Sequence, residues 1–230
     1  MTTLVLLPGL DGTGKLFQSF IRELPGDWRI IVAAYPADAR LGYAELAALV
    51  LSTLPADGPV VLLGESFSGP VAIQLAVELG PRLEALILCC SFARNPRPAL
   101  ARLAPFVGVL PAPAALPSAL SERVLLGADA SAASRALLAQ ALAELPASVL
   151  HARLKAVVKV DVLRLLAQLR APVLYLQADG DLVVPPRSAA NLREVLPTLQ
   201  IVRLDGPHGL LQAAPRAAAA AMLSFLARVG

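Results

Sequence analysis

Three residues that can cooperate in nucleophilic catalysis occur along the chain in the order serine, aspartate, histidine. Ser66 follows an apolar run and lies between Gly64 and Ser68. Asp181 lies in an acidic loop after a second apolar run, and His208 follows a third. A serine hydroxyl becomes a strong nucleophile when a histidine accepts its proton and a carboxylate orients that histidine. These residue types therefore indicate attack on a carbonyl carbon.

The surroundings of Ser66 have the pattern of a strand, a sharp turn and a helix. Residues 60–63 are apolar and mostly β-branched or leucine, and a helical pattern resumes at Phe67. Such a turn exposes the serine beside the first N–H groups of the helix, which favour developing negative charge. The usual pattern is Gly-x-Ser-x-Gly, whereas here Ser68 holds the last position and Gly69 follows. We expect Ser68 to serve only as a small residue behind the turn.

Each of these residues also has a structural interpretation. Ser66 alone could be an idle serine in a buried strand-turn-helix, because so short a pattern recurs by chance. Asp179 and Asp181 could be ordinary turn acids, and His208 could be a surface histidine. The other histidine, His151, follows no apolar run that ends like a strand. The order of the three residues at three expected strand ends favours a joint role.

A glycine-rich loop offers a competing interpretation. Residues 9–16 nearly match the phosphate-binding pattern Gly-x4-Gly-Lys-Ser/Thr, with Lys15 in place, but Leu16 replaces the hydroxyl residue that would hold Mg²⁺. The apolar run at 86–91 also lacks a terminal acid. We therefore prefer a loop whose backbone N–H groups approach a substrate oxygen over a nucleotide-binding loop. Asp11 is expected to cap the helix that follows.

The elements that must position these residues alternate along the chain. Strands are expected at 4–7, 28–35, 60–63, 85–90, 172–176 and 199–204. Helices are expected from Lys15 to Leu24, around 46–54, and at 67–79, 187–195 and 217–229. Alternating strands and helices predict an α/β fold with a mostly parallel, doubly wound sheet of about six strands.

The alternation breaks between residues 92 and 168, where helical fragments rich in Ala, Leu and Pro replace the strands. We expect one domain over residues 1–230, with 92–168 as a helical cap inserted over the carboxyl edge of the sheet. Residues 103–120 carry no acid, and prolines forbid one long helix there. The apolar side chains expected to form a wall for substrate in this stretch are Phe106, Val107, Val109, Leu110, Leu116 and Leu120.

Composition excludes several classes of function. The 230 residues are 57% hydrophobic, carry a net charge of +3 and show no basic block, so nucleic-acid binding has no support. Cys89 and Cys90 are adjacent, and strand neighbours point to opposite faces, so a disulfide between them is not expected. We find no metal-ligand spacing, no signal peptide and no continuous membrane-spanning helix. We expect a soluble, cytoplasmic protein; the sequence gives no indication of its oligomeric state.

Taken together, these motifs resemble those of the α/β-hydrolase family over nearly the whole chain except the insertion. By this resemblance Ser66 is the nucleophile, His208 the base and Asp181 the acid, since Asp-x-x-Val-Pro falls on residues 181–185. That spacing favours Asp181 over Asp179. The resemblance also assigns the oxyanion hole to the backbone N–H groups of Leu10 and Phe67.

Two departures from the family pattern concern the start of the chain. Pro8-Gly9 replaces the usual His-Gly before the oxyanion residue, which keeps the glycine. The first expected strand is the one before this loop, so we expect the family's first two strands to be absent and the sheet to be a minimal six-stranded form. Neither departure removes a catalytic group.

The resemblance implies a serine hydrolase, of the carboxylesterase or thioesterase kind, that cleaves an ester or thioester of a small to medium, largely apolar acyl group. Acyltransferase, lysophospholipase and C–C hydrolase activities use the same three residues and stay open, as does a ligand-binding protein on a hydrolase scaffold. No cofactor or metal is expected. The expected partner is a small-molecule substrate, without nucleic acid or stable membrane insertion.

Overall fold

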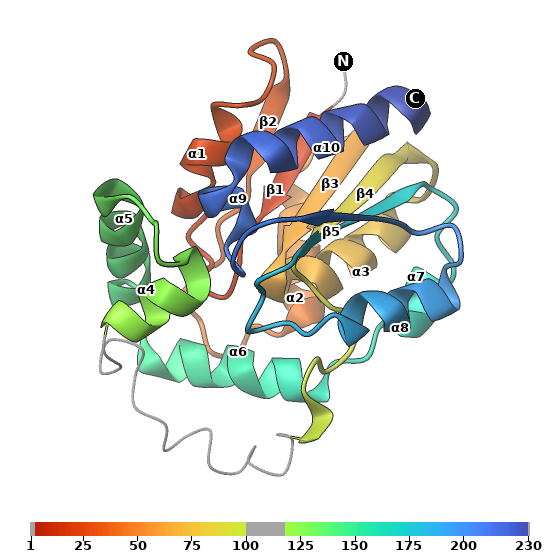
Figure 1. Cartoon of the computed structure of the whole chain (residues 1–230). Coiled ribbons are helices and arrows are strands. Elements are labelled where there is room, and N and C mark those ends of the chain that lie inside the picture. The colour runs from red at the N-terminus through yellow and green to blue at the C-terminus, as the bar shows by residue number, and fades with distance from the viewer. Residues whose placement is uncertain (1–2, 100–117, 230) are drawn as a thin grey trace.

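A single parallel sheet forms the centre of the computed structural model, which describes residues 3–99 and 118–229 (Figure 1). Its strands are β1 (Thr3–Leu7), β2 (Arg29–Val32), β3 (Val60–Glu65), β4 (Leu83–Cys89), β5 (Val173–Ala178) and β6 (Gln200–Leu204). All five strand pairs are parallel, in the order β2-β1-β3-β4-β5-β6. The expected α/β class and six-stranded sheet are confirmed.

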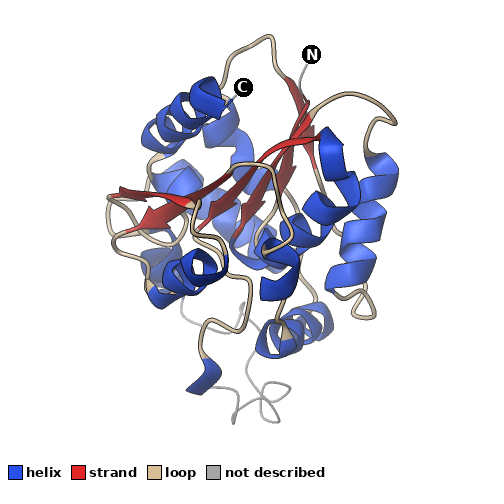
Figure 2. Cartoon of the chain, turned by 90° about the vertical axis from the view of Figure 1, so that its right-hand side faces the viewer, coloured by secondary structure: helices blue, strands red, loops and turns tan. Residues whose placement is uncertain are grey.

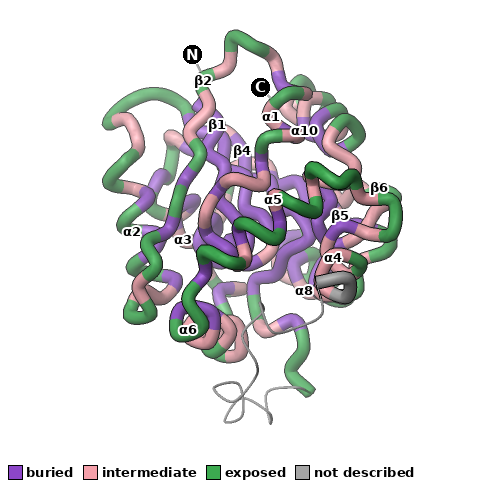
Figure 3. Tube along the Cα trace, turned by 90° about the vertical axis from the view of Figure 1, so that its left-hand side faces the viewer, coloured by how far each residue is buried: buried purple, intermediate pink, exposed green. Residues whose placement is uncertain are grey.

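Helices cover both faces of this sheet (Figure 2). One face packs against α2 (Tyr43–Thr53), α3 (Gly69–Leu79), α7 (Leu163–Leu166) and α8 (Arg187–Val195). The other packs against α1 (Gln18–Ile21), α9 (Leu210–Ala213) and α10 (Pro215–Val229). Successive residues of β1 point into the two cores on opposite faces of the sheet, as the two-residue period of a strand requires. Figure 3 shows the buried residues at the centre of the molecule. This two-sided burial explains the continuous apolar strands.

The first crossover is shorter than the sequence predicts. The expected helix at 15–24 is a 3₁₀ turn, η1 (Lys15–Phe17), followed by the four residues of α1. The N–H groups of Glu23 and Leu24 then bond three residues back, at 3.0 and 3.1 Å. Pro25 disfavours helical geometry at the residue before it, so the helix tightens and ends.

The second strand is also shorter than the expected 28–35. It ends at Val32, although the Ala33 N–H still bonds Leu6 O at 2.9 Å. The Tyr35 N–H then turns to Gly12 O at 2.8 Å, which lies in the loop after β1. The backbone beyond β2 therefore supports that loop instead of extending the sheet.

The segment between β4 and β5 is helical in its described part. It contains α4 (Ser118–Leu126), α5 (Ala132–Ala143) and α6 (Ala147–Lys159) before α7. Figure 1 shows α4, α5 and α6 near one another and far from the chain termini. The apolar wall expected at Phe106 to Leu116 falls outside the described residues, as does the Leu120 side chain. No helix in the described ranges is long and apolar enough to cross a membrane.

Candidate active site

The loop after β1 and the turn after β3 meet at the carboxyl ends of two neighbouring strands. The chain leaves β1 toward β2 on one side and continues from β3 toward β4 on the other, so the strand order reverses here. Open parallel sheets bind ligands in the crevice at such a reversal. A Cβ built on Gly9 would lie 4.0 Å from Ser66 Cβ, which is an ordinary contact distance, so the loop after β1 packs directly against the turn that carries Ser66.

Ser66 occupies a strained turn. Its φ of 49° is in the left-handed region, which residues other than glycine seldom adopt. The Ser91 hydroxyl donates to the Ser66 carbonyl at 2.5 Å. Ser91 is itself fixed by the Tyr175 hydroxyl, which donates to Ser91 O at 2.7 Å and accepts from Ser91 N–H at 3.1 Å. Ser91, which follows β4, and Tyr175 of β5 thus hold the turn in its strained shape.

Ser66, His208 and Asp181 form a continuous chain of hydrogen bonds. Ser66 Oγ lies 2.8 Å from His208 Nε2, and His208 Nδ1 lies 2.9 Å from both Asp181 carboxylate oxygens. The His208 and Asp181 side chains are only 7% and 4% exposed, so water scarcely competes for these bonds. With Nδ1 donating to the carboxylate, Nε2 is free to accept a proton from the serine.

The loop after β5 brings Asp181, rather than Asp179, to the histidine. Asp181 Oδ1 accepts the N–H groups of Val183 and Val184, both at 2.8 Å, which fixes the carboxylate. The Asp179 carboxylate instead pairs with Arg203 at the surface, 2.6 Å away. Of these two acids, Asp181 is therefore the one that contacts His208.

Ser68 does more than keep the turn compact, so that expectation is wrong. Its side chain is fully buried, and its hydroxyl donates to Pro8 O and bonds the Tyr35 hydroxyl at 2.5 Å. Ser68 therefore ties the turn that carries Ser66 to the loop after β1. The close packing is provided by Gly69, where an added Cβ would overlap Ser91 Oγ.

The glycine-rich loop after β1 is fixed by its own side chains. The Asp11 carboxylate accepts the N–H and hydroxyl of Thr13 at 2.8 and 2.5 Å. The expectation that Asp11 caps the following helix is therefore wrong: Asp11 stabilises the turn before η1, and Gly14 is the cap residue. The Lys15 ammonium lies 2.5 Å from Glu144 on the α5 side, where a nucleotide phosphate would have to displace that carboxylate.

A cavity of about 150 Å³ lies against Ser66 and His208. Its apolar wall contains leucines of the insertion: Leu125, Leu126, Leu138 and Leu142. None of these leucines was among the wall residues expected from the sequence. Their signal was a helical spacing on α4 and α5 that looks the same for any packed helix.

Glu65, which lines the same cavity, was also missed. It is 6% exposed, and burial raises the pKa of its carboxyl from 4.5 to about 7, with Asp11 adding to the rise and Gln212 opposing it. A carboxyl group with so high a pKa keeps its proton, and is therefore uncharged, in mildly acidic solution. Its position one residue before the expected nucleophile was the only available signal.

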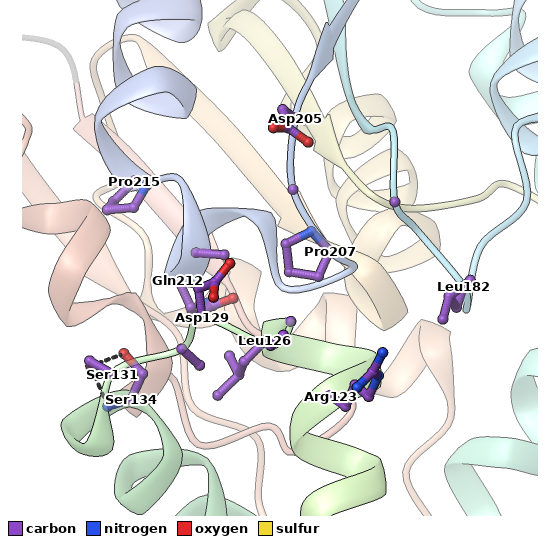
Figure 4. Close-up of a pocket in the computed structure, with 16 residues that line it drawn as sticks. Arg123, Leu126, Asp129, Ser131, Ser134, Leu182, Asp205, Pro207, Gln212 and Pro215 are labelled. Atoms are coloured by element: carbon purple, nitrogen blue, oxygen red, sulfur yellow. Dashed lines mark hydrogen bonds between the residues drawn. The ribbon is translucent and has the colours of Figure 1, made fainter.

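A second, more open cavity of about 720 Å³ adjoins the first, and Leu126 and Gln212 line both. Figure 4 shows that its charged groups, among them Arg123, Asp129 and Asp205, come from α4, the chain after it and the end of β6. Neither Ser66 nor His208 lines this cavity. Ser66 and His208 therefore face the smaller cavity.

The described residues contain no group of three or more His, Cys, Asp or Glu side chains that could hold a metal ion. Cys89 and Cys90 are buried free thiols. Burial raises the pKa of Cys89 well above its ordinary value, so this thiol is a packing residue rather than a nucleophile.

A family model described as "Alpha/beta hydrolase family" matches residues 4–221. The chain belongs to the alpha/beta hydrolase family. A curated protein, polyketide synthase ThaQ of Burkholderia thailandensis, is 30% identical over 253 aligned positions. That match covers 96% of this hydrolase but only 12% of the synthase, so the chain spans about an eighth of its relative's length.

Solved structures share the fold of this alpha/beta hydrolase at low sequence identity. A lipase-esterase related protein from Clostridium acetobutylicum has a TM-score of 0.80 at 16% identity, covering 97% of this chain and 94% of that one. The enol-lactonase from Burkholderia xenovorans has a TM-score of 0.78 at 18% identity, with coverages of 98% and 91%. An esterase from Thermogutta terrifontis reaches 0.76 at 22% identity, with coverages of 99% and 89%.

Proposed function

We propose that this protein is a serine hydrolase that cleaves carboxylic ester or thioester bonds of a small to medium, largely apolar acyl substrate. The observation that supports this most directly is the hydrogen-bond chain from Ser66 Oγ to His208 Nε2, at 2.8 Å, and from His208 Nδ1 to Asp181, at 2.9 Å. The first atom of this series of hydrogen bonds, Ser66 Oγ, belongs to a residue that lines a cavity where the reacting carbonyl group can bind.

The reaction begins when Ser66 Oγ attacks the carbonyl carbon and His208 Nε2 accepts the serine proton. Asp181 stabilises the imidazolium that forms. The backbone N–H groups of Leu10 and Phe67 hold the oxyanion of the tetrahedral intermediate. His208 then donates its proton to the leaving alcohol or thiol, which leaves an acyl group on Ser66. Water, deprotonated by His208, attacks this ester and releases the acid and the free serine.

Two features support an apolar acyl group. Four leucines of α4 and α5 face the cavity beside Ser66. Of the two carboxyl groups that line this cavity, those of Asp11 and Glu65, the Glu65 group is neutral over the acidic range because burial raises its pKa to about 7. A mostly aliphatic wall favours the transfer of methylene groups from water.

The leaving group is the less defined part of the substrate. The curated relative carries the name polyketide synthase, and for this reason we include thioesters beside oxygen esters in the substrate panel. Both leaving groups use the same three side chains, so the panel compares matched acyl groups on p-nitrophenol and on a small thiol.

The test combines covalent labelling with turnover. Wild-type protein should react with a fluorophosphonate probe at Ser66 and hydrolyse acyl esters. Ser66→Ala should lose both properties and remain folded, because the change removes one oxygen. A protein that binds acyl esters without labelling or turnover would be a ligand-binding member on this scaffold, and the proposal would then fail.

A further inference from the structure

Arg153, on α6 of the insertion, is a charged side chain buried at the edge of the site. It is 3% exposed, and burial lowers the pKa of its guanidinium, while Asp11 and Tyr35 favour the charged form. Among the ion pairs of the described residues, none involves Arg153. Burying a charge without an ion-pair partner is costly, so its contacts must compensate.

Those contacts converge on two residues that matter to the proposed reaction. The Arg153 guanidinium donates to Leu10 O at 2.7 Å and to Pro36 O at 3.3 Å. The same group lies over two aromatic rings, 5.7 Å from the centre of Tyr35 and 5.9 Å from that of Phe67. Leu10 and Phe67 carry the two backbone N–H groups proposed to bind the oxyanion.

The loop after β1 is shaped around this guanidinium. Gly12 has a φ of 73°, and a Cβ built on it would lie 2.5 Å from Arg153 Nη1. The Gly12 N–H bonds Gly9 O at 3.1 Å and closes the turn that contains Leu10. A side chain at position 12 would therefore displace the arginine or open the turn.

Ser68 and Arg153 hold the loop at two points. Ser68 bonds Pro8 O from the turn after β3, and Arg153 bonds Leu10 O from α6. Gly9 lies between these two anchors. Without Arg153, the carbonyl of Leu10 would lose this side-chain donor, and the Leu10–Asp11 peptide would be free to turn. That peptide adjoins the Gly9–Leu10 peptide, which carries the Leu10 N–H, so the direction of this N–H would be less tightly fixed.

We propose that Arg153 is a positioning residue for the oxyanion site, which it fixes by bonding the Leu10 carbonyl and packing on the Phe67 ring. This inference rests on the proposed function. It also makes α6 of the insertion a working part of the site, because the oxyanion loop keeps its shape only when α6 is docked. The oxyanion donors act at the transition state, so Arg153 should affect kcat rather than KM.

The test compares Arg153→Met and Arg153→Lys with wild type. Methionine keeps an apolar stem in the same space but donates no hydrogen bond. Lysine keeps the charge but lacks the planar fork that reaches two carbonyl groups. Arg82→Met is the matched control, because Arg82 also donates to two backbone carbonyls, those of Pro55 and Gly58, and precedes β4 at the opposite end of the sheet.

The readout is a pair of ketone inhibitors with the same acyl chain. Ser66 Oγ adds to the carbonyl carbon of a trifluoromethyl ketone, the C=O electron pair moves to oxygen, and His208 takes the serine proton. This adduct needs the oxyanion site, whereas the matching methyl ketone binds mainly without addition. Arg153→Met should lower kcat and the affinity for the trifluoromethyl ketone by the same factor, roughly ten- to hundredfold.

In the supporting result, the KM of Arg153→Met and its affinity for the methyl ketone stay within about twofold of wild type. The kcat of Arg153→Lys and its affinity for the trifluoromethyl ketone fall between those of wild type and Arg153→Met. Arg82→Met binds both inhibitors as tightly as wild type does. Equal weakening of both ketones with a raised KM would overturn the proposal, since Arg153 would then serve substrate binding. Unchanged kcat in a folded variant would also overturn it. If Arg153→Met does not fold, Arg153→Lys is judged by the same inhibitor ratio.

Failure of this inference differs from failure of the proposed function. Hydrolysis by wild type that disappears in Ser66→Ala establishes the reaction without reference to Arg153. If wild type shows no labelling and no turnover that depends on Ser66, the proposed function falls, and the role of Arg153 falls with it.

Discussion

Each polar side chain at the site has partners that restrict it before any substrate arrives. Asp181 is held by two backbone N–H groups, and Ser66 is held through its carbonyl by Ser91. Fixed partners of this kind reduce the reorganisation needed when charge develops. At the scale of residues, the site is therefore preorganised by backbone and side-chain groups that follow three neighbouring strands.

The two acids of the loop after β5 give the first prediction. Asp181→Asn should lower kcat by several orders of magnitude, on the order of 10⁴-fold, because an amide favours the wrong tautomer of His208. Asp179→Asn should change kcat little, since the Asp179 carboxylate pairs with exposed Arg203. Ester hydrolysis at saturating substrate measures both. A larger loss in Asp179→Asn would transfer the role of the acid to that residue.

Glu65 gives a prediction about stability and pH. Its pKa is raised from 4.5 to about 7, so between these values the unfolded chain is ionised while the folded protein keeps the proton. The unfolded state then binds fewer protons, and Glu65 lowers the free energy of unfolding as pH rises from 4.5 to 7. Glu65→Gln should raise that free energy at pH 8 by up to about 3 kcal/mol.

Urea denaturation at pH 4.5 and pH 8 measures this effect. The gain in Glu65→Gln should be small at pH 4.5, where the carboxyl group is protonated in the folded protein. Glu78→Gln is the control, because Glu78 is exposed on α3. A gain of the same size at both pH values would show that burial of the charge is not its cause.

At the scale of elements, the turn from β3 into α3 depends on the absence of a side chain at Gly69. A Cβ there would overlap Ser91 Oγ and lie 2.8 Å from Phe92 O, which is backbone and cannot rotate away. Gly69→Ala should destabilise the fold by roughly 1–3 kcal/mol. It should also slow hydrolysis, because Ser91 would lose its bond to Ser66 O.

Gly26→Ala is the matched control for this change. A Cβ built on Gly26 meets nothing within 4 Å, so that variant should keep wild-type stability and activity. Thermal unfolding and ester turnover of the two variants make the comparison. Wild-type values for Gly69→Ala would mean that the segment after β4 shifts without cost.

The sequence predicts these elements well where the signal is local. Continuous apolar runs such as residues 60–63 predict buried parallel strands, because both faces of the sheet are covered. The roles of Ser68 and Arg153 could not be predicted in this way. Their partners, Pro8 and Leu10, are 60 and 143 residues away, and no periodicity records such a contact.

At the scale of the whole molecule, the segment between β4 and β5 contacts the loops of the candidate site through α4, α6 and the end of α5. The Gly209 N–H, next to His208, bonds Leu125 O of α4 at 2.7 Å. Glu144 at the end of α5 pairs with Lys15, and Arg153 of α6 bonds Leu10 O. The loops after β1 and β6 are thus bonded to the segment between β4 and β5, although the strands determine where those loops begin.

The leucine wall of the insertion gives the last prediction, on acyl chain length. Each methylene buried against it contributes about 0.8 kcal/mol, roughly fourfold in kcat/KM, until the cavity of about 150 Å³ is full. Efficiency should therefore rise from acetyl to butyryl or hexanoyl esters and fall for longer chains. Leu138→Phe, which fills part of the cavity, should move the optimum to shorter chains.

The control for this shift is Leu49→Phe, because Leu49 lies exposed on α2, outside the cavity. It should leave the chain-length profile unchanged. The measurement is kcat/KM for a series of p-nitrophenyl esters with all three proteins. An efficiency that is highest for acetyl and declines steadily in wild type would contradict an acyl pocket under α4 and α5, because added methylenes would then find no apolar surface to bury.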